Sequence, residues 1–537
     1  MKRLTFIFFL ALWNVAGFGA KFYVDPMAGS MSNDGSFDAP WSTFAEVISQ
    51  NKIESYHYLP LPYSSNSHLN VFNQGAPVQA GDTIYLRNGL HGDIVLAGYQ
   101  NIKPIYVFAQ AGQHPVFRQL DVAACRNWVF AGIDISSEPY GDYLTGKLVK
   151  IESHNWHGPC SLIELHGCRI FSGAHPWTTA DEWLNKVSDG VFVRADSIRV
   201  LNNDIRNVAF GIQLVGDYNE ALGNDIVNFS ADGARIEGSH NVFDGNLIKN
   251  CYKVDDNHDD GIQSFTTGGV VVDDNVIRNN IILNYDNPNQ ALLGSMQGIG
   301  CFDGFYHDWV IENNLVVVNH WHGISMYGAI NCRIINNTVL DPTPGIAPGP
   351  SWIKIANHKN GQPSTGCTVK NNVANSFDAP GQSVGSNQSF STVADYHNNF
   401  VDADNYDFNL LSNSVLVDAG DAAVAPPFDI NGTSRANGQG PDIGAYEYEY
   451  IVGTEEVLPE NDIFLLPNPA SDKVSLMGRV KGKIYVFSST GLLVKEVESH
   501  GTVAQISLNN LESGAYFFAF RNETSGELMV RKLVVER

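Results

Sequence analysis

The residues best suited to acid–base chemistry lie close together in the segment NCYKVDDNHDDGIQSF, residues 250–265. One histidine, His258, stands there among basic and acidic side chains: Lys253, Asp255, Asp256, Asp259 and Asp260. A histidine beside carboxylates can act as a general base, because imidazole exchanges its proton near neutral pH. Clustered carboxylate oxygens also suit a hard cation such as Ca²⁺. The segment therefore predicts a catalytic base or a calcium site, with a solvated acidic turn as the simpler alternative.

A second set of candidate groups lies in VVVNHWHGISMYG, residues 316–328, which contains His320, His322 and Tyr327. Two histidines one residue apart do not define a zinc site without a third ligand at a set spacing. We therefore expect acid or base roles for His322 and Tyr327. For each histidine, the simpler alternative is an ordinary residue at the rim of the groove without a catalytic role.

Both segments fall within a repeat that runs from Ser188 to Phe377. In each of seven copies, Gly and an apolar residue open an alternating strand, a turn follows, and a second apolar strand ends on an asparagine. Strand-length apolar runs without a helical period predict β-coils that bury their inner faces by stacking. The expected fold is all-β: a right-handed parallel β-helix, or solenoid, followed by a small C-terminal antiparallel β-sandwich.

The repeated asparagines are expected to be structural, because stacked side-chain amides can hydrogen-bond along the axis of the solenoid. The asparagines that recur in the seven copies are Asn203, Asn224, Asn246, Asn275, Asn314, Asn337 and Asn372.

Alternation along the strands predicts which side chains leave the core. If the apolar residue after each Gly points inward, seven outward pairs follow: Phe192 and Arg194, Gln213 and Val215, Arg235 and Glu237, Gln263 and Phe265, Gly300 and Phe302, Ser325 and Tyr327, Lys354 and Ala356. Rungs about 4.8 Å apart would make these pairs a groove of roughly 29 Å, long enough for several sugars. The residues just before each Gly would line its edge: Asp189, Asp232, Asp260 and His322.

The formal net charge of the 537-residue chain is −24. A nucleic-acid partner would require a basic face, so this charge argues against one. An anionic substrate must then meet local positive charge or a bound cation. The seven cysteines are an odd and sparse set, which does not fit a disulfide framework. Cys332 and Cys367 occupy equivalent places in neighbouring coils, where we expect stacked buried thiols, with a bridge between them as the alternative.

Changes in composition and residue pattern along the chain predict four parts. Residues 1–20 have the basic start, apolar run and small-residue end of a secretory signal peptide. Residues 21–450 form the β-helix and catalytic domain, residues 451–462 an acidic linker, and residues 463–537 a small β-domain. We expect an exported protein, secreted or at the cell surface, that acts as a monomer.

The sequence resembles known families in three ways. The opening text FYVDPMAGSMSNDGSFDAPWSTFAEVI and the closing text DINGTSRANGQGPDIGAYEYEY resemble exported bacterial β-helix proteins of the polysaccharide lyase-like group. PNPASD, the SSTG hairpin and LESGAYFF resemble the C-terminal sorting domain of the type IX secretion system, which implies the outer-membrane secretion machinery as a partner. The pattern ADG…NVF…NHDDG is similar to calcium-dependent pectate lyases. At the position of the third aspartate in the pectate lyase motif, this sequence has Gln263, and the lysine that follows ADG in that family has no clear counterpart here.

A groove that carries Arg, Lys, Gln, His and Tyr suits the chemistry of a uronic acid. Once its carboxylate is neutralised, a base can remove the carbon-5 proton, and loss of the carbon-4 oxygen completes a β-elimination. The sequence therefore predicts a lyase that acts on a uronate-containing anionic polysaccharide or its oligosaccharides.

Each candidate residue then has an expected role. Arg235 and Gln263 are expected to neutralise the carboxylate, and Lys354 or Arg194 to hold neighbouring acidic groups. Further substrate contacts are expected from Gln213 and Lys253. The base would be His258 or Tyr327, with His322 as a second acid or base.

Four alternatives remain open at this stage. A dehydratase and a uronate epimerase share the first step. A hydrolase of polygalacturonase type needs two carboxylates, and its NTD, DD, GHG and RIK motifs are echoed loosely by SDG (188–190), HDD (258–260), WHG (321–323) and WIK (352–354). The fourth alternative is a surface adhesin that binds glycans without catalysis.

Overall fold

The computed structural model describes residues 19–266 and 268–450, and in the C-terminal part residues 464–466, 468, 470–488, 492–521 and 528–535. The chain forms two compact units, Met1–Tyr450 and Ile451–Arg537. The expected signal peptide lies outside the described residues except for its last two positions. The expected linker, residues 451–462, lies outside them entirely.

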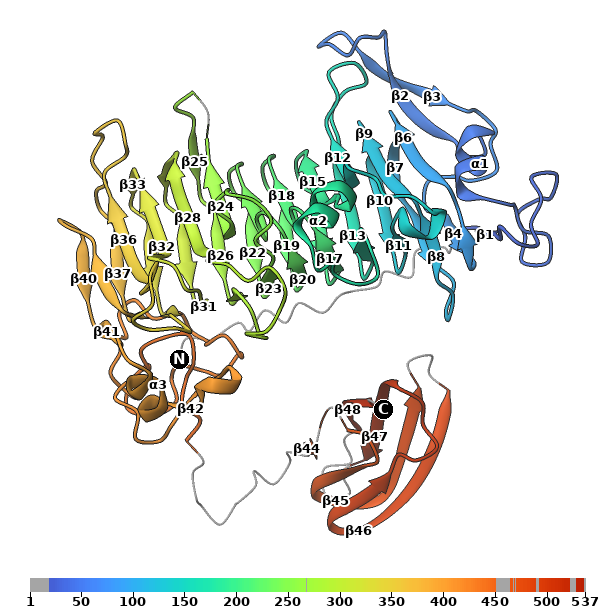
Figure 1. Cartoon of the computed structure of the whole chain (residues 1–537). Helices are drawn as coiled ribbons and strands as arrows, with labels where there is room; N and C mark the ends of the chain where they lie inside the picture. The colour runs from blue at the N-terminus through green and yellow to red at the C-terminus, as the bar shows by residue number, and fades with distance from the viewer. Residues whose placement is uncertain are drawn as a thin grey trace, which may run out of the picture. The chain divides into compact units, whose positions relative to one another are not determined.

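The first unit is a stack of β-coils that confirms the predicted parallel β-helix (Figure 1). One sheet has 13 strands, from β1 (Lys21–Val24) to β40 (Ser383–Gly385), and a second has 12, from β5 (Gly89–Leu90) to β41 (Gln388–Ser389). The third sheet has 11 strands and carries the predicted outward pairs, so we name it the groove sheet. In spatial order its strands are β6 (Asp93–Ala97), β9 (Gln119–Ala123), β12 (Lys147–Glu152), β15 (Asp189–Arg194), β18 (Ile212–Leu214), β21 (Ala234–Ile236), β24 (Asp260–Phe265), β28 (Gln297–Asp303), β32 (His322–Tyr327), β36 (Trp352–Ala356) and β39 (Ser376–Asp378).

Shorter elements decorate this stack. Near its N-terminal end lie α1 (Phe44–Ser49), whose N-cap Thr43 accepts a hydrogen bond from the Glu46 amide, and the hairpin of β2 (Ser55–Leu59) and β3 (His68–Phe72). The remaining ones are η1 (Glu138–Tyr140), α2 (Ala180–Lys186), the small sheet of β25 (Val271–Asp273), β29 (Phe305–His307) and β33 (Ala329–Ile330), α3 (Val393–Asn399), η2 (Ala403–Asn405), and the pair β42 (Phe400–Asp402) and β43 (Asp407–Leu410).

The second unit contains antiparallel strands, as expected for the C-terminal domain. These are β44 (Phe464–Leu466), β45 (Lys473–Ser488), β46 (Leu493–Ser507), β47 (Gly514–Arg521) and β48 (Leu528–Val535). Alternate residues such as Val474, Ile484 and Phe518 are fully buried in a separate hydrophobic core. The unit therefore has its own folding core.

A column of glycines allows the coils of the first unit to stack closely at the start of the groove-sheet strands. Its members are Gly190, Gly211, Gly233, Gly261, Gly298 and Gly323. A Cβ at any of them would come within 2.1–2.5 Å of a backbone oxygen or a core methyl group. This close approach explains why Gly opens six of the seven copies of the repeat, and it leaves the residue before each Gly at the edge of the sheet.

A buried asparagine ladder runs along the stack, with one correction to the prediction. Its members are Asn203, Asn224, Asn246, Asn280, Asn314, Asn337, Asn372 and Asn387, and each amide donates to the side-chain oxygen of the next at 2.9–3.2 Å. Asn275 is not in this ladder. Its side-chain oxygen accepts a hydrogen bond from the backbone N–H of Asn241, in a second and shorter row. The fourth copy contains asparagines at both positions, and the spacing alone did not distinguish them.

All seven cysteines are buried and free. This confirms the expectation that they do not form a disulfide framework, and that Cys332 and Cys367 are buried thiols.

The ladder predicts a large effect of Asn246→Ala on stability. The Asn246 side chain accepts two hydrogen bonds from Asn224 and donates to Ala221 and Asn280, all in the buried interior. Leaving such groups unpaired costs roughly 1–3 kcal/mol each, so we expect a loss of about 3 kcal/mol or more. The measurement is thermal unfolding of the full chain. Asn66→Ala, at an exposed turn, is the control, and equal melting temperatures for the two variants would contradict a buried ladder.

Candidate active site

The predicted outward residues lie on consecutive rungs of the groove sheet. Cα partners run in the order Phe192, Gln213, Arg235, Gln263, Gly300, Ser325 and Lys354. Their neighbours Ala234 and Ile236 are buried in the core instead. The predicted inward and outward register is therefore confirmed.

A cavity of about 560 Å³ opens over the middle rungs of this sheet. Six of the predicted site residues line it: Arg235, His258, Asp259, Gln263, His322 and Tyr327. They come from β21, the turn before β24, β24 itself and β32. The repeat thus brings together residues that are up to 92 positions apart in the sequence (327 minus 235).

Arg235 is held rigidly at this cavity. Its Nε donates to Asp232 at 2.5 Å, and its guanidinium lies over two rings, 4.2 Å from the Phe210 centroid and 5.4 Å from that of Phe265. Among the described residues, no acceptor engages its terminal nitrogens. The side chain is only 24% exposed. Arg235 therefore presents a preoriented pair of N–H groups to an anion.

His258 and Asp260 form a histidine–carboxylate pair. Nδ1 of His258 lies 3.2 Å from Oδ2 of Asp260, and the same oxygen accepts the Gln263 amide at 3.0 Å. The hydrogen bond to Asp260 raises the pKa of His258 above its ordinary value, against the opposing effect of partial burial. Because Nδ1 faces the carboxylate and the His258 side chain is 63% exposed, Nε2 is available to a substrate.

Three carboxyl groups are buried beneath the cavity. Burial raises the pKa of Asp232 to about 6 and that of Asp259 to about 7, and it also raises the pKa of Asp260. Lys253 lies 3.2 Å from Asp259, Arg235 contacts Asp232, and His258 contacts Asp260. Each buried carboxyl group therefore has its own cationic partner.

Two buried oxygens on adjacent rungs have no donor among the described residues. They are Oδ1 of Asp260 and Oε1 of Gln297, whose Cα atoms are partners in β24 and β28. Gly300 makes room for the first, since a Cβ there would lie 2.6 Å from Asp260 Oδ1. Gln297 lines the cavity, so a bound hydroxyl group could donate to this edge.

His322 forms the opposite wall as a neutral ring. Burial, then the neighbouring His320, lowers its pKa to about 4. The indole nitrogen of Trp352 donates to its Nδ1 at 3.3 Å, and the Ser325 hydroxyl lies 2.9 Å from the same nitrogen. Nδ1 is therefore an acceptor, and the proton of the neutral ring is on Nε2. His322 is a hydrogen-bond donor toward the cavity.

Comparison with known proteins supports this architecture. Residues 189–349 match the family model of a right handed beta helix region, and residues 465–536 match that of a secretion system C-terminal sorting domain. The chain is exported through the type IX secretion system. Its export machinery is a partner, and its location is the cell surface or the medium. No helix among the described residues is long and apolar enough to cross a membrane.

Several solved structures are similar in fold. Pectate lyase Pel9A is 18% identical, covering 81% of this chain and 98% of its own, with a TM-score of 0.40. A mannuronic acid specific polysaccharide family 6 lyase from human gut microbiota is 12% identical, covering 57% and 78%, with a TM-score of 0.32. The A-module of the mannuronan C-5 epimerase AlgE4 of Azotobacter vinelandii is 14% identical, covering 57% and 88%, with a TM-score of 0.24. The comparison with curated protein sequences finds no match.

Seven predicted residues lie outside the cavity lining: Arg194, Gln213, Lys253, Lys354, Asp255, Asp256 and the buried Asp260. Arg194 contacts Glu152 at 2.5 Å, Gln213 donates to Asp189 at 3.4 Å, and Lys354 contacts Asp378 at 2.6 Å. Asp255 and Asp256 are exposed in the turn before β24. Lys253 also does not line the cavity, but it reaches the site through Asp259. These cations are therefore matched to neighbouring carboxylates rather than directed at the cavity.

Other residues of the cavity were not assigned as site residues from the sequence. Phe210, Gln297 and the ion pair of Lys359 with Asp303, at 2.6 Å, all line it. Phe210 and Gln297 each directly precede a glycine of the column, at the edge of the sheet. At this position only the acidic residues and His322 are predicted from the sequence to line the groove. Asp303 lies at a shift of register between β24 and β28, which no sequence pattern indicated.

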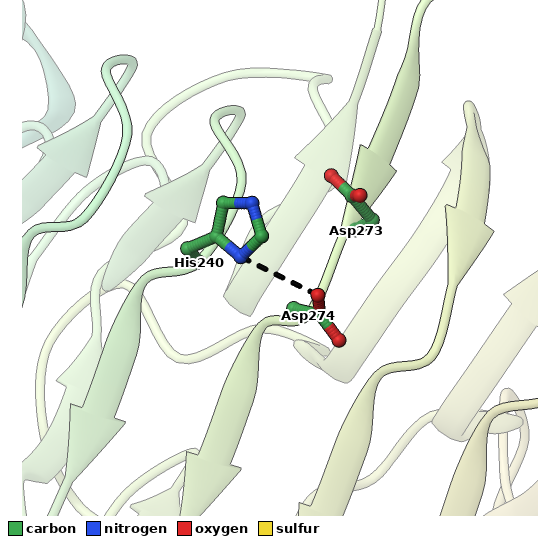
Figure 2. Close-up of side chains that lie close together, drawn as sticks. All are labelled: His240, Asp273 and Asp274. Carbon is green, nitrogen blue, oxygen red and sulfur yellow. Dashed lines mark ion pairs between the residues drawn. The ribbon is translucent and has the colours of Figure 1, made fainter.

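The acidic residues predicted as a calcium site do not gather their ligand atoms. Among the described residues, the one group of three whose ligand atoms lie within 4.8 Å of one another is His240, Asp273 and Asp274. Figure 2 shows His240 facing Asp274, and their closest atoms are 3.4 Å apart. His240 lies in the turn after β21, Asp273 is the last residue of β25 and Asp274 follows it, and none of the three lines the cavity.

The pKa values of the two cavity histidines should be shifted in opposite directions from that of an ordinary histidine. His258 should remain protonated to a pH above 6.5, whereas His322 should stay neutral until the pH falls to about 4. NMR titration, with resonances assigned through His258→Gln and His322→Gln, measures both values. Asp260→Asn removes the main cause of the His258 shift and should lower its pKa. An unchanged His258 value in that variant would contradict the pair.

Proposed function

We propose that this protein is a secreted lyase that β-eliminates at carbon-4 of a uronic acid within an anionic polysaccharide or its oligosaccharides. The observation that carries the proposal is the position of Arg235. Its preoriented guanidinium faces the same cavity as the His258–Asp260 pair and the donors of the opposite wall. An anion-binding group and a base in one cavity are the two parts that carbon-5 deprotonation needs.

Arg235 neutralises the uronate carboxylate. Its two terminal nitrogens suit the two carboxylate oxygens, and a fixed cation stabilises the charge that moves onto those oxygens when the carbon-5 proton leaves. Phe210 and Phe265 hold the guanidinium in place, so little rearrangement is needed during the reaction. On this edge Gln297 lines the cavity, and its Oε1, which has no donor among the described residues, is the acceptor for a substrate hydroxyl.

His258 removes the carbon-5 proton through Nε2. Asp260 orients its ring and stabilises the imidazolium that forms. The electron pair of the broken carbon–hydrogen bond forms the carbon-4–carbon-5 double bond, and the carbon-4–oxygen bond breaks. The Tyr327 hydroxyl transfers its proton to the leaving oxygen, and the Nε2–H of neutral His322 donates a hydrogen bond to that oxygen. Proton exchange with water then restores Tyr327 and His258. The products are a 4,5-unsaturated uronate and a new chain end.

The donor set of the site does not fit calcium, and we propose that the reaction needs none. Arg235, His258 and Gln263 already donate to the carboxylate oxygens that would be ligands, and Lys253 faces Asp259. A hard cation would have to displace these groups. Arg235 and Lys253 supply positive charge to Asp232 and Asp259, and the Nδ1–H of His258 donates to Asp260, so the carboxyl groups have partners without an ion.

A hydrolase is the second candidate, for one specific reason. The sequence paired the Asp259 segment with Asp189, 70 residues earlier, whereas the structure places Asp232 on the rung next to Asp260. Burial raises the pKa of Asp232 to about 6 and that of Asp259 to about 7, which suits an acid and a base near neutral pH. Both residues line the same cavity.

The product distinguishes these functions. The full secreted protein is incubated with polygalacturonate, alginate, ulvan and glycosaminoglycans, with and without EDTA. We expect ultraviolet absorbance from the conjugated double bond together with new reducing ends, and equal rates in EDTA. Reducing ends without absorbance would support the hydrolase, and absorbance without cleavage a dehydratase. Altered uronate stereochemistry would support an epimerase, and binding alone an adhesin. Activity lost in EDTA and restored by Ca²⁺ would contradict the metal-free site.

Arg235→Lys tests the anion-binding role while keeping a positive charge beside Asp232. Loss of the two-nitrogen contact removes a charge-assisted interaction worth roughly 1.5–3 kcal/mol, so kcat/KM should fall about 10- to 150-fold. The loss should include kcat, because the contact strengthens as charge develops. Arg278→Lys, which alters an exposed pair with Asp244, is the matched control. Unchanged kinetics in Arg235→Lys would contradict the assignment.

A further inference from the structure

A ledge of tryptophans adjoins the cavity at its β36 side. Trp321 directly precedes His322, and Trp352 is the partner of His322 on the next rung. The two indoles are stacked, with centroids 6.5 Å apart and planes 20° from parallel. Trp321 is 43% exposed, which is a large apolar area for a protein surface. We name Trp321 and Trp352 the aromatic ledge.

The ledge is built in place by contacts with the cavity wall. The Trp352 ring lies 5.3 Å from that of His322, and its indole nitrogen donates to both His322 and Ser325 at 3.3 Å. The backbone oxygen of Trp321 accepts hydrogen bonds from the amides of Gly323 and Trp352. Trp352 is therefore fixed on the rung next to His322, and Trp321 packs between Trp352 and His320 while leaving much of its surface exposed.

A cation completes the surface. Lys354, which follows Trp352 on β36 in the outward column, has its Nζ 5.2 Å from the Trp352 centroid. It contacts Asp378 at 2.6 Å, but that carboxylate is itself half exposed. The rung thus offers an aromatic face beside an ammonium group. The apolar face of a pyranose ring packs on aromatic rings, while a uronate carboxylate needs a cation.

We infer that the aromatic ledge and Lys354 form a subsite for the uronate residue adjacent to the one in the cavity. The inference rests on the proposed function and extends it to substrate length. One rung advances about 4.8 Å, close to the length of one sugar unit, so a chain along the groove reaches Trp321 as it leaves the cavity. The ledge binds a sugar that is not chemically altered, and it selects polymers and longer oligosaccharides over short ones.

The experiment is Trp321→Ala in the full chain, with uronate oligosaccharides of increasing length as substrates. KM for the longest should rise about tenfold with kcat unchanged, whereas the shortest that reacts should show no change. Trp321→Phe should restore most of the affinity because it keeps an aromatic face. Trp156→Ala removes a tryptophan that is 51% exposed and does not line the cavity, and it should change nothing.

Affinity electrophoresis in gels that contain the uronate polymers separates this inference from the reaction. Retardation of the wild type that is weakened by Trp321→Ala supports the ledge whether or not an unsaturated product forms. An unsaturated product with equal kinetics for Trp321→Ala at every chain length would overturn the ledge and leave the lyase intact. Failure of the wild type to bind any of the polymers would overturn the assignment of the ledge to a uronate.

Discussion

The stacking of one coil directly on the next is the constraint on which the rest of this structure depends. Parallel pairing fixes the rung spacing near 4.8 Å, and in the middle coils the glycine column lets adjacent backbones approach with no Cβ between them. The asparagine ladder then satisfies buried amides from coil to coil. As a result, the relative positions of Arg235, Gln263 and His322 are set by rung number rather than by loop conformation.

The same stacking places charge where water is scarce. Asp232 and Asp260 precede glycines of the column, so their side chains lie at the sheet edge beneath the turn that carries Asp259. Burial raises the pKa of all three carboxyl groups. The folded protein therefore loses stability as the pH rises above the pKa that each group has in the unfolded chain. Arg235, His258 and Lys253 offset this cost by pairing. A solenoid can carry such a cluster because the coils on either side are held by independent contacts.

The two units divide the work of the chain. The β-helix has one long hydrophobic core and carries the cavity, whereas the C-terminal strands close around a separate core and match a sorting domain. The segment that matches a sorting domain and the cavity therefore belong to different cores. Because the whole chain is acidic, the function proposed here depends on local positive charge at the cavity, which Arg235 supplies.

The sequence by itself determined the β-coils, their strand register and the sorting domain, because each depends on periodicity or on a local motif. The alternation around Gly233 and Gly261 was enough to place Arg235 and Gln263 side by side. Only the tertiary structure decided that Asn280, not Asn275, enters the main ladder, since both fit the local pattern. It also decided that Arg194 and Lys354 are matched by Glu152 and Asp378, while Phe210 and Trp352 flank the cavity. These outcomes depend on which side chains meet across neighbouring coils. Because insertions make the coils unequal in length, the spacing of residues in the sequence does not predict these contacts.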